Sequence, residues 1–452
     1  MIKKNSHFQY FLYSLPSLPL AALSMPVYIF LPSYYADTLG LGLAVTGLVL
    51  FVTRIWDVVT DPVIGILGDR TRGLFGIFKG RRKPWMIMGM IPTLLGTWFL
   101  LVPPDGAGIM HLLVWSLILY LGWTAVILPL QAWGAELSPY YDERSKISAW
   151  REGLTVFGIL GTLGLIAALG YSTDGLESKA LLTIAAVTLI LLPLTVGLAC
   201  LFVPERPYLF ENKISFREGL KTLVNNKAFR ILILAYLING VANGLPATLF
   251  IFYVKYALQM PDLTEIFLFI YFACGFIAVP LWLRLSFTYG KHVVWAGAMI
   301  WACVFFLMVP FIEPGDKWFY LAIVILTGLS LGADLVLPAA MQADVVDCDT
   351  LDSGQQRTGL YFALWSMSTK LSLAIAAGLA FPLLQLLGFE KNQPGTADQT
   401  LWPLIILYSI VPVILKLIAI FIMMKYPLNR EIVEKNRQEI KEKWVEPRNM
   451  EH

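Results

Sequence analysis

Three charged residues stand close together in an apolar stretch near the N-terminus: Arg54, Asp57 and Asp61. At 3.6 residues per turn they share one helix face, and the two carboxylates are one turn apart. An ionised side chain near the centre of a bilayer costs roughly 3 kcal/mol or more, so such groups normally face a protein-lined cavity. Pro62 cannot donate an amide hydrogen to the carbonyl one turn before it, and Thr60 adds a hydroxyl. These oxygens predict a cation site.

The same charges could instead form a purely structural ion pair, in which Arg54 neutralises Asp57 or Asp61. One guanidinium cannot neutralise two carboxylates inside a membrane, so the cation site is the favoured interpretation. Na⁺ would then be the metal held by the two aspartates. A proton fits equally well, and because the four histidines lie near predicted helix ends, proton coupling would depend on carboxylates.

A second set of polar side chains lies inside apolar runs of the C-terminal part. Asp334 and Lys370 have similar predicted depth on consecutive helices, so they either pair with each other or serve a site. In the second case Lys370 would compete with a cation for carboxylates or bind the solute. Asn239 and Asn243 share a helix face and could bind solute or bridge helices. Lys416 is expected to snorkel towards the membrane surface or to cap a helix end.

The composition is that of an integral membrane protein. The 452 residues are 57% hydrophobic and 14% charged, with a mean hydropathy of +0.68. The polar start is followed by a long, proline-rich apolar run, which does not fit a cleaved signal peptide. Four scattered cysteines indicate neither a disulfide framework nor a metal motif. We expect no enzyme activity, no cofactor besides the coupling ion, no nucleic-acid partner, and contact with the lipid bilayer.

Apolar runs of spanning length predict an all-α protein with about twelve transmembrane helices. The runs lie near residues 9–36, 43–68, 84–103, 109–136, 151–171, 180–203, 228–256, 264–288, 291–312, 318–343, 359–387 and 400–425. A linker at 204–227 separates a six-helix half at 1–203 from a second at 228–425, and a polar tail follows at 426–452. Lys and Arg gather in alternate loops, which predicts that both termini are cytoplasmic.

The two halves share a weak repeat. A proline, an acid at the helix end, a second acid and an arginine follow one another at matching places. The two sets are Pro129, Glu136, Asp142, Arg144 and Pro338, Asp344, Asp349, Arg357. Two such halves are typical of transporters that bind a solute near the membrane midplane.

A Gly-rich, basic loop follows the second predicted helix. Asp69 and the basic residues near it could pair with helix ends in one conformation and release them in another. The alternative is that the loop only marks the cytoplasmic side. The residues expected to act in conformational change or gating are Arg54, Asp69, Arg70, Glu136, Asp142, Arg144 and Asp344.

The Arg54–Pro62 motif, the loop up to Trp85 and the run ending at Lys370 resemble the glycoside–pentoside–hexuronide:cation symporter family. This family includes the melibiose permeases and, more distantly, sodium–lysophospholipid symporters. The similarity extends over essentially the whole chain. It implies a major facilitator fold and secondary active symport.

The resemblance also implies roles for individual residues. Asp57 and Asp61, with hydroxyls at Thr60 and Thr124, would hold Na⁺, Li⁺ or H⁺. Arg151 corresponds to the arginine that contacts sugar in the family. Lys370 corresponds to the family's lysine on the eleventh helix. The residues expected to bind substrate are Arg151, Gln131, Lys370, Asp334, Asn239 and Asn243.

The chain departs from the melibiose permeases at three positions. Two acids that hold sugar hydroxyls in those proteins are replaced by Ala21 and Ile127, and an aromatic residue is replaced by Gln131. Sugar hydroxyls need convergent polar partners, so the solute is expected to differ from a galactoside.

Together the sequence predicts a multi-pass protein of the cytoplasmic (inner) membrane that acts as a monomer. It would couple Na⁺ or H⁺ to the uptake of a sugar, a glycoside or another small organic solute. The alternative substrate is an amphiphile such as a lysophospholipid. The sequence leaves open the solute, the choice among Na⁺, H⁺ and uniport, the stoichiometry and the oligomeric state.

Overall fold

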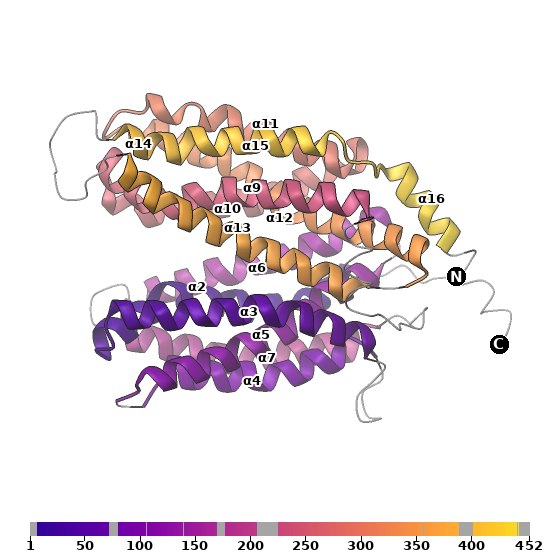
Figure 1. Cartoon of the computed structure of the whole chain (residues 1–452), viewed down its shortest axis with the longest axis horizontal. Coiled ribbons are helices and arrows are strands. Elements are labelled where there is room, and N and C mark those ends of the chain that lie inside the picture. Colours follow the sequence, from indigo (N-terminus) through magenta and orange to yellow (C-terminus); the bar gives the residue numbers. More distant parts are fainter. Residues whose placement is uncertain are drawn as a thin grey trace. The chain divides into compact units, whose positions relative to one another are not determined.

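The computed structural model is helical throughout the described residues, among which no strand occurs (Figure 1). The described residues are 7–71, 80–104, 106–138, 140–169, 177–205, 225–355, 357–387, 401–440 and 442. The chain divides into two compact units. Unit 1 comprises Met1–Leu220, Val346–Leu364 and Glu434–His452, and unit 2 comprises Lys221–Val345 and Trp365–Val433.

Unit 1 is a bundle of long helices. Its elements are α1 (His7–Ser14), α2 (Ser17–Ser33), η1 (Tyr34–Thr38), α3 (Leu43–Arg70), α4 (Lys83–Leu101), α5 (Ile109–Leu137), α6 (Tyr141–Ala168) and α7 (Glu177–Phe202). Figure 1 shows α3, α4, α5 and α7 running alongside one another. Glycines let α4 and α5 approach closely, since a Cβ added at Gly89 would lie 2.7 Å from the Cβ of Ala125. This contact holds the middle of α5 in place beside α3 and α4.

Unit 2 is a second helical bundle. Its elements are α9 (Lys227–Phe252), η2 (Tyr253–Ala257), η3 (Pro261–Leu263), α10 (Thr264–Tyr289), α11 (Lys291–Phe306), η4 (Val309–Phe311), most of α12 (Lys317–Ser353) and α13 (Thr358–Leu386), α14 (Trp402–Ile405), η6 (Ile406–Ile410), α15 (Val411–Met423) and the start of α16 (Arg430–Ile440). An aromatic core fixes one end of the unit, where Tyr253 stacks on Tyr408 at 4.2 Å. The hydroxyls of Tyr408 and Tyr320 are 2.8 Å apart.

The predicted membrane helices agree with the described elements. Nine helices in the described part of the chain are long and apolar enough to cross a membrane. Three more helices, α2, α3 and α6, overlap the remaining predicted runs, although α6 begins at Tyr141, well before the run at 151–171. The first run is divided, because α1 ends at Ser14 and α2 begins at Ser17, around Pro16. The chain is therefore a multi-pass membrane protein, whereas the predicted linker lies mostly outside the described residues.

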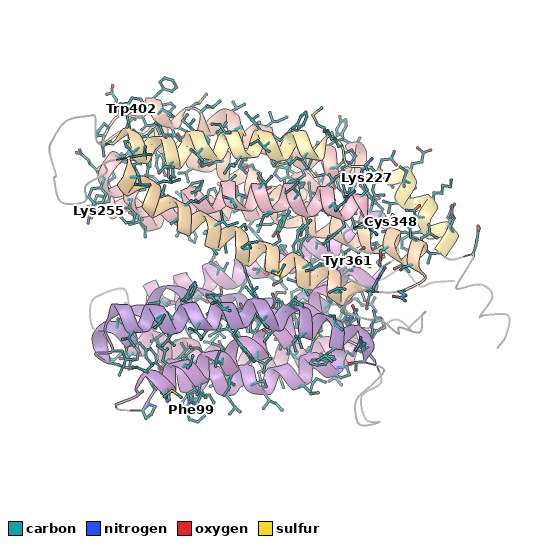
Figure 2. The ribbon with its side chains drawn as sticks, viewed as in Figure 1. Phe99, Lys227, Lys255, Cys348, Tyr361 and Trp402 are labelled. Atoms are coloured by element: carbon teal, nitrogen blue, oxygen red, sulfur yellow. The ribbon has the colours of Figure 1, made fainter. Side chains whose placement is uncertain are left out.

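Two long helices pass from one unit into the other. The C-terminal end of α12 and the first turns of α13, Val346–Leu364, belong to unit 1. Cys348 and Tyr361, both labelled in Figure 2, lie in this segment. A division at the predicted linker, 204–227, would put Val346–Leu364 in the C-terminal half, whereas the structure assigns this segment to unit 1.

Candidate functional site

A hydroxyl of α5 lies between the two aspartates of α3. Thr124 Oγ1 is 3.0 Å from Asp57 Oδ1 and 3.1 Å from Asp61 Oδ1. All three side chains are buried, and Asp61 has no exposed surface. The structure thus brings together two acids that are one turn apart and a threonine from a different helix.

This geometry brings two negative charges close together. A hydroxyl carries one hydrogen, so Thr124 donates fully to only one carboxylate at a time. Two carboxylates that share one site repel each other strongly where water is excluded. A bound proton or a monovalent cation removes this repulsion. Within the described residues no group of three or more His, Cys, Asp or Glu could hold a metal, so a cation here would bind two carboxylates and neutral oxygens.

Thr60 lies beside these acids on the same helix. Its Oγ1 donates to the backbone carbonyl of Asp57 at 3.1 Å, and the residue is buried. The hydrogen of this hydroxyl is therefore used within α3, while its oxygen keeps lone pairs for a cation. Pro62 lies inside α3 without interrupting it.

Arg54 is placed between an acid and an aromatic ring. Its Nη1 is 3.9 Å from Asp57 Oδ2, which is too long for a hydrogen bond. Its Cζ lies 4.8 Å from the ring centre of Tyr120 on α5, within the range of a cation–π interaction. A third of the side chain is exposed. The guanidinium can therefore lean towards the carboxylate or towards the ring.

Unit 2 contains a separate buried polar cluster around Asp334 of α12. Trp295 Nε1 and Asn239 Nδ2 donate to Asp334 Oδ1 at 2.6 and 3.1 Å. Asn243 Nδ2 donates to Asp334 Oδ2 at 3.0 Å, and Lys416 Nζ lies 3.6 Å from the same oxygen. Three helices, α9, α11 and α15, thus direct donors at one carboxylate of α12.

The expectation that Lys416 snorkels to the membrane surface or caps a helix end is wrong. The residue is 6% exposed, and its Nζ donates to Asn239 Oδ1 at 2.8 Å. Two oxygen acceptors inside the bundle compensate the buried ammonium, so it does not need to reach the surface. The ion pair of Asp334 is formed by Lys416. Lys370 lies on α13 next to Thr369, whose Oγ1 is 3.0 Å from the hydroxyl of Tyr236.

The remaining candidates for solute contact lie in unit 1. Arg151 on α6 is buried, and its Nε and Nη2 donate to Glu152 Oε1 at 3.0 and 2.6 Å. Gln131 on α5 has a buried Oε1 with no hydrogen-bond partner among the described residues. Buried amide oxygens are normally paired, so this oxygen is a candidate acceptor for a ligand.

A network of charged side chains joins helix ends in unit 1. Arg82 Nη2 donates to Asp69 Oδ1 at 2.7 Å and to Glu136 Oε1 at 2.6 Å. Burial alone would lower the pKa of Arg82, but the carboxylates of Glu136 and Asp69 more than compensate and raise it. Asp69 also accepts the backbone N–H groups of Gly359 and Leu360 at 2.8 and 3.0 Å. This carboxylate therefore caps the first turn of α13.

A second acid binds two arginines. Asp347 on α12 accepts from Arg144 on α6 and from Arg437 on α16, each at 2.8 Å. The polar tail thus contributes a charged partner through Arg437 of α16. Of the other gating candidates, Asp142 lies in the first turn of α6 and Arg70 is the last residue of α3.

Several partners in these networks were missed by sequence reasoning. Glu136 and Asp344 were singled out as helix-end acids, but their bases were not. Glu136 pairs with Arg81 and Arg82 just before α4, and Asp344 pairs at 2.7 Å with Lys291, the first residue of α11. The signal was available, because each base stands at the start of one apolar run and the matching acid stands at the end of the next run.

Comparison with known proteins gives consistent results. The profile of the MFS/sugar transport protein family matches residues 12–430. The chain is 26% identical to the sodium-dependent lysophosphatidylcholine symporter 1-A of Danio rerio, over 91% of this chain and 84% of the relative. It is 27% identical to the putative glycoside/cation symporter YagG of Escherichia coli, over 90% of this chain and 89% of the relative.

Solved structures share the fold. The E. coli fucose:proton symporter FucP matches with a TM-score of 0.67 at 14% identity, over 94% of this chain and all of FucP. A bacterial homologue of the iron transporter ferroportin, in an outward-facing state, matches with a TM-score of 0.68 at 14% identity, over 93% of this chain and 98% of that protein. At this identity the likeness concerns the fold alone.

Proposed function

The chain belongs to the MFS/sugar transport protein family, and we propose that it is a symporter that couples inward movement of Na⁺ or H⁺ to uptake of a small organic solute. The favoured solute is a sugar or a glycoside. The observation that supports this proposal most directly is the position of Thr124 Oγ1 within 3.1 Å of both Asp57 and Asp61.

The coupling ion acts by neutralising the acids of α3. Bare carboxylates are costly to move through an interface that excludes water, so the unloaded protein resists the change between its outward-open and inward-open states. A bound Na⁺ or proton removes that cost. If the solute binds better when the cation is present, the cation must also bind better when the solute is present.

The charged networks at the helix ends act as the cytoplasmic gate. Asp69 caps α13, and Asp347 holds Arg144 and Arg437. These bonds form in one conformational state and break in another, so their strength sets the balance between the states. We propose that both termini lie on the cytoplasmic side of the inner membrane, and the distribution of basic loop residues supports this orientation.

Each unit, taken by itself, holds polar groups that we propose as solute contacts. In unit 1 the candidates are the guanidinium of Arg151 and the Oε1 of Gln131, which has no partner within the described part of the chain. In unit 2 the candidates are Lys370 and the amides held by Asp334. The protein acts as a monomer, with the predicted linker at 204–227 joining its two six-helix halves.

The second candidate substrate is a lysophospholipid. Animal relatives at 26% identity are sodium-dependent lysophosphatidylcholine symporters. In addition, apolar residues replace two acids that would hold sugar hydroxyls, at Ala21 and Ile127. Both observations favour an amphiphile over a strongly polar disaccharide.

The test is thermal stabilisation of the purified protein, because a ligand stabilises the state that it binds in proportion to occupancy. The panel contains D-xylose, L-fucose, melibiose, methyl glycosides and lysophosphatidylcholine, each with and without Na⁺ at two pH values. A sugar whose stabilisation grows with Na⁺ supports the main proposal. Stabilisation by lysophosphatidylcholine alone supports the second candidate, and no response to any solute or cation contradicts both.

A further inference from the structure

Two amides of α9 hydrogen-bond to the same carboxylate. Asn239 Nδ2 donates to Asp334 Oδ1, and Asn243 Nδ2 donates to Asp334 Oδ2. An ionised carboxylate only accepts hydrogen bonds, so the NH₂ group of each amide must face Asp334. The carbonyl oxygen of each amide therefore points away from it. The cluster fixes the orientation of both side chains.

The two amide oxygens have different surroundings. Asn239 is 2% exposed, and its Oδ1 accepts from Lys416 Nζ at 2.8 Å. Asn243 is half-buried, and no donor from the described residues reaches its Oδ1. Only Asn243 therefore presents a fixed carbonyl oxygen to a bound molecule.

The cluster is electrically balanced without a ligand. The carboxylate of Asp334 has donors from Trp295, Asn239 and Asn243 and an ion pair with Lys416. Little capacity is left for a solute to bind the carboxylate itself. A neutral amide oxygen selects a hydrogen-bond donor such as a hydroxyl group, and it gives no attraction to an anionic group.

We propose that Asn243 Oδ1 accepts a hydrogen bond from a hydroxyl group of the transported solute. Asp334 and Lys416 are positioning residues that hold Asn243 in this orientation, and Asn239 belongs to the framework of unit 2. This inference rests on the proposed symport function and narrows its substrate to a neutral, polyhydroxylated molecule such as a sugar or glycoside.

The test uses the purified full-length protein in Na⁺ and the free sugars and methyl glycosides of the panel above. The sugar that binds wild-type protein most tightly is compared with its deoxy and fluoro analogues at each hydroxyl. Fluorine cannot donate a hydrogen bond. At one position we expect both analogues to bind wild-type protein about tenfold more weakly than the parent sugar.

The same titrations are repeated with Asn243→Leu and with Asn243→Ala, which adds no bulk. Both variants should bind the parent sugar about tenfold more weakly and should no longer distinguish it from the analogues at that position. Stabilisation by Na⁺ alone, measured without sugar, should be unchanged and shows that the variants are folded. Asn239→Leu, one turn away, should lower thermal stability but keep the discrimination.

Two results would overturn the inference, and they distinguish an error about Asn243 from an error about sugar symport. If Asn243→Leu or Asn243→Ala binds the sugar with wild-type affinity and discrimination, the role of Asn243 is wrong while sugar symport stands. If wild-type protein binds none of the sugars, or only lysophosphatidylcholine, sugar symport fails and this inference fails with it.

Discussion

Asp69, near the end of α3, accepts the backbone N–H of Gly359 at 2.8 Å, although 290 positions separate the two residues in the sequence. The same carboxylate accepts the N–H of Leu360 and the guanidinium of Arg82. One side chain thus stabilises the first turn of α13 and a buried charge before α4. In the proposed gate, Asp69 therefore contacts both the start of α13 and the residue that precedes α4.

We expect Asp69→Asn to loosen the start of α13. Hydrogen bonds to charged groups contribute roughly 1.5–3 kcal/mol, and the neutral amide keeps only one acceptor for two N–H groups. Hydrogen–deuterium exchange of the amides of Gly359 and Leu360 should therefore become at least about tenfold faster. Asp262→Asn, at an exposed acid, is the matched control and should change nothing. Unchanged exchange in Asp69→Asn would show that the cap is unimportant.

Much of the fold could be predicted from the sequence because a bilayer demands long apolar helices. The runs at 84–103 and 228–256 correspond closely to α4 (Lys83–Leu101) and α9 (Lys227–Phe252). The passage of α12 and α13 from unit 2 into unit 1 was not predictable. It depends on contacts such as that of Asp69 with α13, which carry no local sequence pattern.

Only part of the candidate site could likewise be predicted from the sequence. Asp57 and Asp61 are one turn apart on one helix, so periodicity alone pairs them. Thr124 was identified only through a family resemblance, since its distance to them depends on how α5 packs against α3. Lys416 was misassigned because hydropathy does not indicate that Asn239 and Asp334 accept its ammonium group inside the bundle.

The cation site makes the next prediction. Asp57→Asn and Asp61→Asn should each weaken or abolish stabilisation of the purified protein by Na⁺ or by protons, because one of the two charges that a cation neutralises is gone. A shift in Na⁺ affinity of at least about tenfold is expected, which corresponds to about 1.4 kcal/mol. Asp262→Asn again serves as the control. Wild-type Na⁺ titration curves in both aspartate variants would exclude these acids as ligands.

Arg54 and Tyr120 provide a sharper test of the same site. The ring of Tyr120 attracts the guanidinium by roughly 0.5–2 kcal/mol, and so competes with Asp57 for Arg54. Tyr120→Leu should let Arg54 move onto the carboxylate and weaken Na⁺ binding several-fold. Tyr120→Phe keeps the ring and should bind Na⁺ like wild type, whereas Arg54→Gln should bind it more tightly. Equal affinities in the leucine and phenylalanine variants would contradict this competition.

The buried pair in unit 2 gives the last prediction. Lys416→Met leaves Asp334 without its ion-pair partner, and breaking a buried pair costs about 3–5 kcal/mol. The thermal midpoint should fall clearly in this variant. Adding Asp334→Asn removes the uncompensated charge, so the double variant should recover most of the lost stability.

Lys370→Met is the matched control, since it makes the same substitution on α13. Because the ion pair of Asp334 is with Lys416, Lys370→Met and Asp334→Asn should have additive effects on the thermal midpoint. The double-mutant cycle therefore shows which of the two lysines forms the ion pair with Asp334. Recovery by Asp334→Asn in the Lys370→Met background, and none in the Lys416→Met background, would assign the pair to Lys370 and remove Lys416 from the set of positioning residues for Asn243.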